Sequence, residues 1–177
     1  MSADPPSSTG SPFWRFSLRF YRQPKVADAC IALQEEAGVD VNLLLFLLWQ
    51  ATLKRALSPI EVGELESRIG AWREATVIPL RGVRRALKSP PALVEPATAE
   101  AFRTRIKAVE LEAERLQQEA MYQLACASPL GREAASADAA ARGNIAVYAT
   151  IARAPLAKAA VETLLTSFAA LERKMEE

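Results

Sequence analysis

The sequence predicts an all-α protein, and three observations support this fold class. Apolar residues recur at intervals of three and four along most of the chain, and no segment alternates apolar and polar residues with a period of two. Helix-start signals stand directly before several apolar segments. With 177 residues, 50% apolar and 24% charged, the chain suits one globular domain. We therefore expect a bundle of about seven to eight helices around a central apolar helix, residues 41–57, with one long helix at residues 98–127.

The N-terminal region is expected to contain a tail and two short helices. Residues 1–10 are rich in proline and serine, which predicts a disordered tail. Ser11 followed by Pro12 is typical of a helix start, and aromatic residues crowd the helix that follows. A second helix, near residues 24–37, should end at Gly38, because glycine is favoured after the last helical turn.

The most apolar segment of the chain begins after Asp40, a residue type that caps helix starts. Residues 43–49 are leucine, phenylalanine and tryptophan without interruption. A helix with no polar face needs neighbours on every side, so we expect residues 41–57 to lie at the centre of the bundle. The segment is shorter than the roughly 20 apolar residues that cross a bilayer, and we expect no membrane span.

Two further helices are predicted before a proline-rich connector. The sequence Ser58-Pro59-Ile60-Glu61 is a capping box with proline at the first helical position, and its helix should reach about Gly70. The next helix, residues 72–88, should bend at Pro79, because proline removes a backbone hydrogen bond. Its expected inner face comprises Val77, Leu80, Val83 and Leu87. Residues 89–96 are rich in proline and are predicted to be a semi-rigid connector.

The long helix, residues 98–127, carries apolar residues spaced as in a helix-packing seam. This seam consists of Phe102, Ile106, Val109, Ala113, Leu116, Ala120 and Leu124. A helix of about 30 residues is roughly 45 Å long, so its far end should rest on the C-terminal segment or on another chain. We expect residues 11–127 to form the core domain, and the alanine-rich residues 128–177 to form a helical extension that packs on this core or on a second subunit.

The composition excludes several classes of enzyme. The chain has no histidine, which excludes Ser-His-Asp and Cys-His catalysis as well as zinc and di-iron sites that need histidine. It has neither a phosphate-binding nor a dinucleotide-binding glycine motif, and its aspartates are isolated. The net charge of +1 argues against a strongly basic nucleic-acid binder. We therefore predict no catalytic residue, no metal and no cofactor.

The two cysteines and the N-terminus bear on the cellular compartment. Cys30 and Cys126 lack the spacing of a metal or redox pair, and each stands among alanines on a predicted helix, so we interpret both as core residues. The N-terminus has Asp4 where a secretory signal would be basic, and it has no apolar run. We expect a cytoplasmic protein.

Four cations should share one helix face, because Arg81, Arg84, Arg85 and Lys88 stand at positions i, i+3, i+4 and i+7. Such a face can bind phosphate, RNA or an acidic protein surface. Alternatively, cations at a helix C-terminus complement the helix dipole and keep the surface hydrated. No aromatic residues accompany these cations as they do in single-strand binders, so an acidic protein or phosphate is favoured over RNA.

A second contact surface is predicted on the long helix, where Leu111 and Tyr122 project roughly opposite the seam. Two apolar groups on an otherwise hydrated face indicate contact with the C-terminal helices or with a partner. Glu110 and Glu114, one turn apart, have the spacing of a divalent-cation site, but ion pairing on an exposed helix explains the same residues.

Trp14, Trp49 and Trp72 lie on three predicted helices that should converge. One interpretation is a pocket for an apolar ligand, with Asn42 as its polar anchor. The other is core packing, with Asn42 satisfying free amides at the helix start.

Several uncommon sequence blocks occur together and in order. They are Phe13–Ser17, Ala32–Glu35, Val39–Trp49, Trp72–Arg73 with Pro79–Arg81, Arg84–Lys88, and Lys107–Glu114. On these blocks, residues 11 to about 125 resemble the DUF2390 family of small proteobacterial proteins of unknown function. The resemblance implies a cytoplasmic bacterial helical protein and supplies no activity, cofactor or catalytic residue.

We therefore expect a non-catalytic protein that binds a protein partner through the basic face and the outer face of the long helix, with a homodimer as one form of that association. An enzyme or apolar-ligand carrier built around the tryptophans is the first alternative. An RNA- or ribosome-associated factor is the second.

Overall fold

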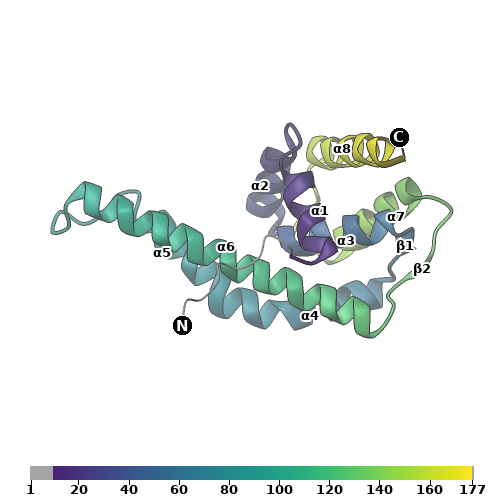
Figure 1. The fold of residues 1–177 in the computed structure, drawn as a ribbon, viewed down its shortest axis with the longest axis horizontal. Coiled ribbons are helices and arrows are strands. Elements are labelled where there is room, and N and C mark those ends of the chain that lie inside the picture. The colour runs from purple at the N-terminus through teal and green to yellow at the C-terminus, as the bar shows by residue number, and fades with distance from the viewer. Residues whose placement is uncertain (1–9, 177) are drawn as a thin grey trace, which may run out of the picture.

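The structure, a computed structural model, describes residues 10–176 and is all-α, as predicted. Within these residues the α-helices are α1 (Pro12–Tyr21), α2 (Val26–Ala37), α3 (Val41–Thr52), α4 (Pro59–Trp72), α5 (Ile78–Ala86), α6 (Pro96–Ala127), α7 (Ala137–Ile151) and α8 (Lys158–Glu176) (Figure 1). The predicted disordered tail lies outside the described residues, apart from Gly10.

One short antiparallel pair of strands, which the sequence did not predict, joins two loops. β1 (Arg55–Ala56) pairs with β2 (Arg132–Glu133). Gly131 precedes β2 with a φ of +67°, and a Cβ atom there would lie 2.7 Å from the carbonyl oxygen of Ala56. Glycine fits this close approach because it has no Cβ. Strands of two residues are too short for an alternating pattern to predict them.

Two helix-start signals in the sequence are confirmed by their side-chain caps. Asp40 Oδ1 accepts a hydrogen bond from the backbone N–H of Leu43 at 3.0 Å. At the start of α4, the Ser58 N–H donates to Glu61 Oε2 at 2.7 Å, and the Glu61 N–H donates to Ser58 Oγ at 3.3 Å. These contacts satisfy backbone donors that a helix start otherwise leaves free.

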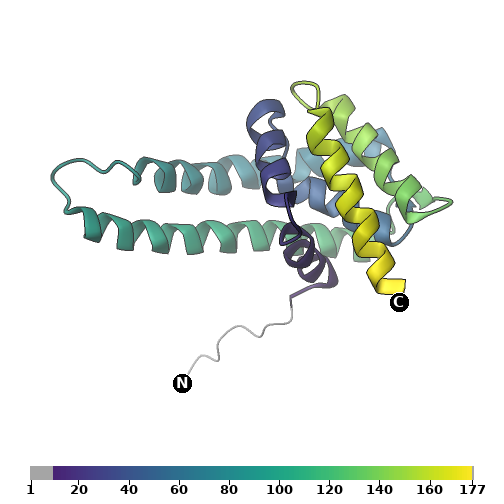
Figure 2. The same cartoon turned by 90° about the horizontal axis from the view of Figure 1, so that it is seen from above.

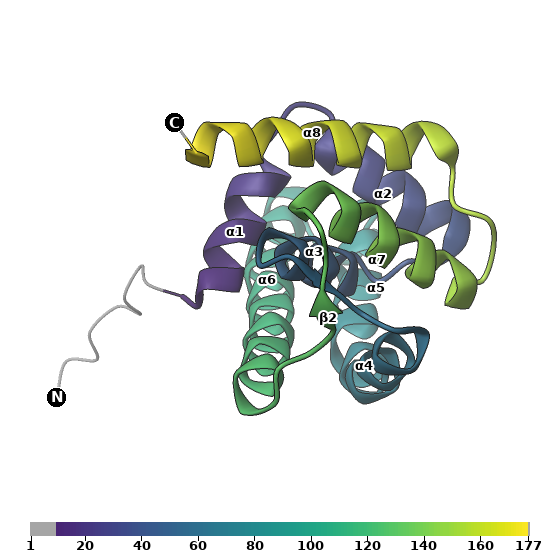
Figure 3. The ribbon, with the colours of Figure 1, turned by 90° about the vertical axis from the view of Figure 1, so that its right-hand side faces the viewer.

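The apolar helix α3 lies at the centre of the body (Figure 3). Every residue from Asn42 to Ala51 is buried, and α1, α6 and α7 all contact the helix. The helix ends at Thr52, whereas the sequence predicted that it would end at residue 57. Lys54 adopts a left-handed conformation with a φ of 54°, and the next two residues pair as β1. A left-handed residue cannot continue a right-handed helix.

The C-terminal helices pack on this body within the same chain (Figure 3). α7 contacts α3, α8 contacts α2, and their apolar residues belong to the same core cluster. Asn144 of α7 is fully buried. Its Oδ1 accepts a hydrogen bond from the Leu57 N–H at 2.8 Å, and its Nδ2 donates to the carbonyl oxygens of Leu47 at 2.9 Å and Arg55 at 3.0 Å. One side chain thus joins α7 to α3 and to the loop that follows it.

Helices α4 and α5 form one continuous rod instead of two separate helices. A π-helical turn, Arg73–Val77, joins them where the sequence predicted a break near Gly70 and a bend at Pro79. In a regular α-helix the ring of Pro79 would collide with the carbonyl of Ala75. The π-turn widens the helix at that point, so the chain passes Pro79 without ending the rod.

The rod and α6 form a hairpin whose far end projects from the body (Figure 2). Helix α6 begins two residues earlier than predicted, because the Glu95 carboxylate accepts the Thr98 N–H at 2.8 Å and caps the helix start. Its 32 residues correspond to a length of about 48 Å. We call the projecting part, residues 78–116, the arm.

The buried face of α6 differs from the predicted apolar seam. Its buried residues are Ala99, Glu110, Ala113, Gln117, Gln118 and Met121. Of the seam residues, all of them described, Ala113 alone is buried, whereas Phe102, Val109 and Leu116 are exposed. An apolar pattern cannot predict this face, because three of its residues are polar and their partners lie on other helices.

Candidate interaction site on the projecting hairpin

Ion pairs between α5 and α6 hold the inside of the arm together. Arg81 Nε lies 3.0 Å from Glu110 Oε1, and Arg81 Nη2 lies 2.8 Å from Glu114 Oε1. The Arg84 guanidinium contacts the other oxygen of Glu110. Arg81 also donates to Gln34 Oε1 of α2 at 2.8 Å, which ties the arm to the body. One buried carboxylate therefore receives two guanidinium groups.

The two carboxylates of this cluster have opposite shifts in pKa. Burial raises the pKa of Glu110, but the hydrogen bonds from Arg84 and Arg81 lower it by more than burial raises it. The pKa of Glu110 therefore lies below its ordinary value. For Glu114, burial outweighs the ion pair with Arg81, and the pKa lies above its ordinary value. Of the two carboxylates, Glu110 is therefore the one whose charged form the arginines stabilise more.

The four cations that were predicted to share one exposed face are divided between the interior and the surface. The side chains of Arg81 and Arg84 are 20% and 21% exposed and contact α6. Arg85 lies at the surface, 3.3 Å from Glu35 of α2, and Lys88 is exposed with no ion pair to a described residue. Arg81 and Arg84 therefore pair with α6 of the same chain rather than with a separate acidic protein. The buried carboxylate of Glu110 requires this compensating positive charge.

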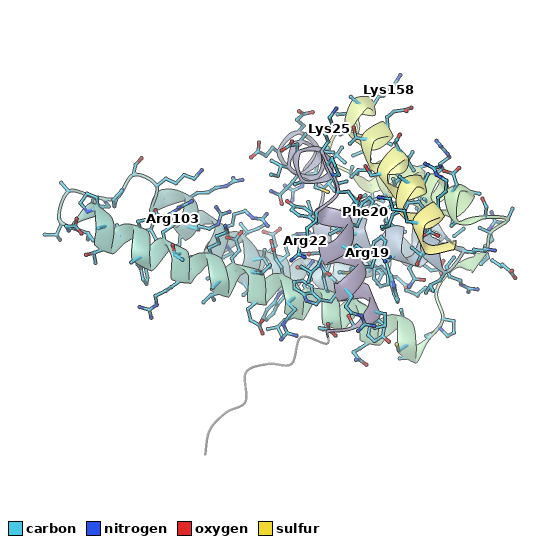
Figure 4. All side chains as sticks on the ribbon, turned by 45° about the horizontal axis from the view of Figure 1, so that its top comes forward. Arg19, Phe20, Arg22, Lys25, Arg103 and Lys158 are labelled. Carbon is cyan, nitrogen blue, oxygen red and sulfur yellow. The ribbon has the colours of Figure 1, made fainter. Side chains whose placement is uncertain are left out.

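Other cations are spread over both parts of the molecule. Figure 4 shows the positions of Arg103 on the arm and of Arg19, Arg22, Lys25 and Lys158 on the body. Arg103 donates to Glu100, one turn earlier on α6, at 2.7 Å. Positive charge therefore does not mark out one site.

A second polar cluster joins the base of the arm to the start of α3. Asp40 Oδ2 accepts hydrogen bonds from Arg73 at 3.0 Å and from Gln117 Nε2 at 2.9 Å. Arg73 also pairs with Glu66 at 2.6 Å. Burial lowers the pKa of Arg73, but its contacts with Glu66 and Asp40 raise it above the ordinary value. The sequence identified Asp40 as a cap but not Arg73 or Gln117, because no local pattern shows that they meet it.

Asn42 and Trp72, two residues of the predicted ligand pocket, also lie where the arm meets the body. Asn42 Oδ1 accepts a hydrogen bond from Gln118 Nε2 at 2.8 Å. Trp72 Nε1–H donates to the carbonyl oxygen of Ala113 at 3.0 Å. Both contacts are made with α6, so these two residues help to hold the hairpin and the body together.

The three tryptophans lie in different surroundings. Trp49 is buried among aromatic rings, with its centroid 5.4 Å from that of Phe13 and 5.6 Å from that of Phe46. Trp72 lies at the base of the arm and is 38% exposed, and Trp14 is half-buried on α1. Trp49 therefore contacts aromatic rings of the core, whereas Trp72 contacts α6 at the base of the arm.

Leu111 and Tyr122, the predicted second contact surface, also differ in their surroundings. Leu111 lies on the arm and is 51% exposed. Tyr122 is half-buried, and its ring centroid lies 5.6 Å from that of Trp49 in the core. Leu111 therefore belongs to the surface of the arm, whereas Tyr122 packs against the body.

Helix α5 turns Arg81 and Arg84 toward α6 and leaves two apolar residues exposed. None of its residues is buried, and Ile78 and Val83 are 43% and 44% exposed. The predicted inner face consisted of Val77, Leu80, Val83 and Leu87. Of these four residues, Val77 is buried in the π-turn and Leu80 and Leu87 are half-buried, so the prediction is wrong for Val83. The ion pairs of Arg81 and Arg84 with α6 favour this rotation of the helix, which leaves Ile78 and Val83 at the surface.

The neighbouring surface of α6 is apolar as well. Phe102, Val109 and Leu116 follow one another at intervals of seven residues and are 45%, 51% and 44% exposed. Near the tip of the arm an open hollow of about 490 Å³ is lined mostly by apolar residues, including Leu87 and Phe102, and also by Thr98 and Arg105. Leu87 and Phe102 therefore lie on the same side of the arm, which exposes apolar residues from both of its helices.

The described residues show neither a bilayer-spanning helix nor a metal site. Between residues 10 and 176, no helix combines the length and the apolar character that crossing a bilayer requires. In the same range, no three or more acidic or cysteine side chains gather in a way that could hold a metal ion.

Comparisons with known proteins bear on the family of the chain. No curated protein and no solved structure matches it. A family model described as "Protein of unknown function (DUF2390)" matches residues 12–121, which include α1 to α5 and most of α6. The chain therefore belongs to the DUF2390 family.

Proposed function

We propose that this is a non-catalytic cytoplasmic protein that acts by binding another protein through the arm. The proposal rests mainly on the orientation of α5, in which Arg81 and Arg84 contact α6 while the apolar Ile78 and Val83 stay exposed. Both cysteines are free, which agrees with a reducing compartment.

Two features suit the arm to protein binding. It projects from the body, so a partner can reach both of its helices (Figure 2). It also exposes neighbouring apolar residues, including the aromatic Phe102, and apolar and aromatic side chains anchor protein interfaces. Contiguous apolar patches on a single chain commonly mark a contact surface. Ion pairs supply the cohesion inside the arm, so the apolar residues outside remain available for a partner.

The cations that remain at the surface favour a partner with acidic residues. Arg85 and Lys88 stand at the end of α5 and are exposed. Charges at the rim of an interface chiefly affect the rate of association and its salt dependence. We expect these two residues to orient the partner and the apolar residues to hold it.

Site-specific photocrosslinking in the native host tests the proposal. A photoreactive amino acid replaces Val83 or Val109 on the arm, and Ile60, which is 75% exposed at the start of α4, serves as the control position. We expect a discrete crosslinked product from the arm positions and no comparable product from Ile60. No product from either arm position, or equal products from all three positions, would contradict the proposal.

A further inference from the structure

Exposed apolar residues of α6 form one of the two sets of positions in a heptad pattern. Phe102, Val109 and Leu116 are seven residues apart, and Ile106 and Ala113 stand between them in the same pattern. Ala113 is buried and Ile106 is half-buried, so this second set packs within the hairpin. In a coiled coil both sets contact a partner helix. The exposed set, which we call the stripe (Phe102, Val109 and Leu116), lacks such a partner among the described residues.

The stripe is symmetric about its middle residue. A two-fold axis at Val109 would pack two copies of α6 antiparallel, with Val109 against Val109 and Phe102 of each copy against Leu116 of the other. A contact of this kind needs only one self-complementary surface. The stripe extends over about 21 Å of helix. Because Leu87 of α5 shares the hollow with Phe102, the contact can include both helices of each arm.

Charged residues beside the stripe match this antiparallel arrangement. Arg105 stands four residues before Val109, and Glu112 stands three residues after it, on the same flank of the helix. The two-fold axis brings the same flank of both copies together, so Arg105 of each copy faces Glu112 of the other. Arg105 has no ion pair with a described residue, whereas Glu112 is 53% exposed and pairs with Arg115 of its own helix at 2.7 Å. Two opposite-charge contacts therefore flank the apolar stripe.

We propose that the stripe is the contact between two copies of this chain, packed antiparallel about Val109. The inference rests on the proposed function, in which the arm binds protein, and adds that the partner is a second copy. The heptad spacing supplies the apolar contact. The reciprocal pairing of Arg105 with Glu112 sets the direction of the second copy.

Sedimentation equilibrium of the full chain is the first test. We expect a species of twice 19.3 kDa with a Kd at or below about 10 μM. Val109→Glu places two carboxylates at the axis and should raise the Kd at least about 100-fold, because like charges in contact cost several kcal/mol. Lys107→Glu, on the opposite side of α6, is the matched control and should leave the Kd unchanged. Circular dichroism of each variant verifies its helix content.

A charge reversal is the second test. Arg105→Glu and Glu112→Arg each place like charges opposite one another and should raise the Kd about tenfold. The double variant R105E/E112R exchanges the two charges and should restore the Kd to within about threefold of the wild type. A change that merely perturbed the helix would not be reversed in this way.

The outcomes separate this inference from the proposed function. A wild-type chain that stays monomeric up to about 100 μM overturns the inference. A crosslinked product from Val83 or Val109 that contains a different protein would then still support the arm as a binding site. A dimer that Val109→Glu leaves intact overturns the stripe as its contact. A double reversal that fails to restore dimerisation overturns the antiparallel arrangement.

Discussion

The ion pairs inside the arm predict that Glu110→Gln destabilises the protein. Glu110 accepts hydrogen bonds from two guanidinium groups, and a hydrogen bond to a charged group contributes about 1.5–3 kcal/mol. Glutamine keeps one acceptor oxygen, leaves one arginine without its charged partner, and is itself less costly to bury. We expect the free energy of unfolding to fall by about 2 kcal/mol. For a chain of 177 residues this corresponds to a drop in Tm of about 4–8 °C.

Urea unfolding followed by circular dichroism measures this loss, and the pH dependence gives its sign. Because the pKa of Glu110 is lower in the folded chain than its ordinary value of 4.5, its contribution is present above that value and is lost as the pH falls through the folded pKa. The difference between the wild type and Glu110→Gln should therefore shrink when the pH is lowered from about 7 to about 3. The pKa of Glu114 is raised, so its charged form opposes folding relative to its protonated form. Glu114→Gln should be neutral or stabilising at pH 7.

Glu100→Gln is the control, because Glu100 is 58% exposed and pairs with Arg103 one turn later on the same helix. Removing such a pair should change the free energy of unfolding by no more than about 0.5 kcal/mol. If Glu110→Gln is as stable as Glu100→Gln at neutral pH, the inward-facing arginines do not stabilise the arm, and the explanation given for the orientation of α5 is refuted.

Three further predictions concern the body. Asn144→Ala removes three hydrogen bonds to backbone groups, two of them buried, and should lower the free energy of unfolding in urea by about 3 kcal/mol; a loss below about 1 kcal/mol would show that these groups find other partners. Gly131→Ala forces a Cβ against a carbonyl oxygen at positive φ and should cost about 1–3 kcal/mol, whereas Gly63→Ala, with nothing within 4 Å, should stabilise α4 by about 0.5–1 kcal/mol; equal effects on Tm would contradict this contrast. Burial raises the pKa of the Cys30 thiol to about 12, so a thiol reagent should label the exposed Cys126 in the native chain and reach Cys30 only after unfolding.

The parts of the fold that depend on residues close together in the sequence could be predicted from it. The start of α4 is an example, because Ser58 and Glu61 satisfy each other's backbone across three residues. The end of α3 depends instead on β1 meeting β2 far along the chain, and no signal near Lys54 shows this pairing. The start of α4 could therefore be predicted from local signals, whereas the end of α3 could not.

The candidate site could be predicted only in part, for the same physical reason. An amphipathic helix shows the same spacing whichever face is turned inward, and apolar residues usually face the core. In α5 the buried Glu110 also draws Arg81 and Arg84 inward, because a buried carboxylate needs cations close by. Arg81 and Arg84 lie one turn apart, as do Glu110 and Glu114, and this matched spacing is the signal that would have indicated their pairing.

The position of Asn144 has a consequence for relatives of this protein. The family match ends at residue 121, yet the carbonyl of Leu47 and the amide of Leu57, both inside the matched region, are satisfied from α7, which lies beyond it. The segment that the family model matches thus depends on a later helix for the hydrogen-bond partners of two of its backbone groups. Any family member whose later helices diverge must offer an equivalent amide to the same backbone atoms or rebuild the loop after its apolar helix. Substitutions in these two regions are therefore expected to be linked through evolution.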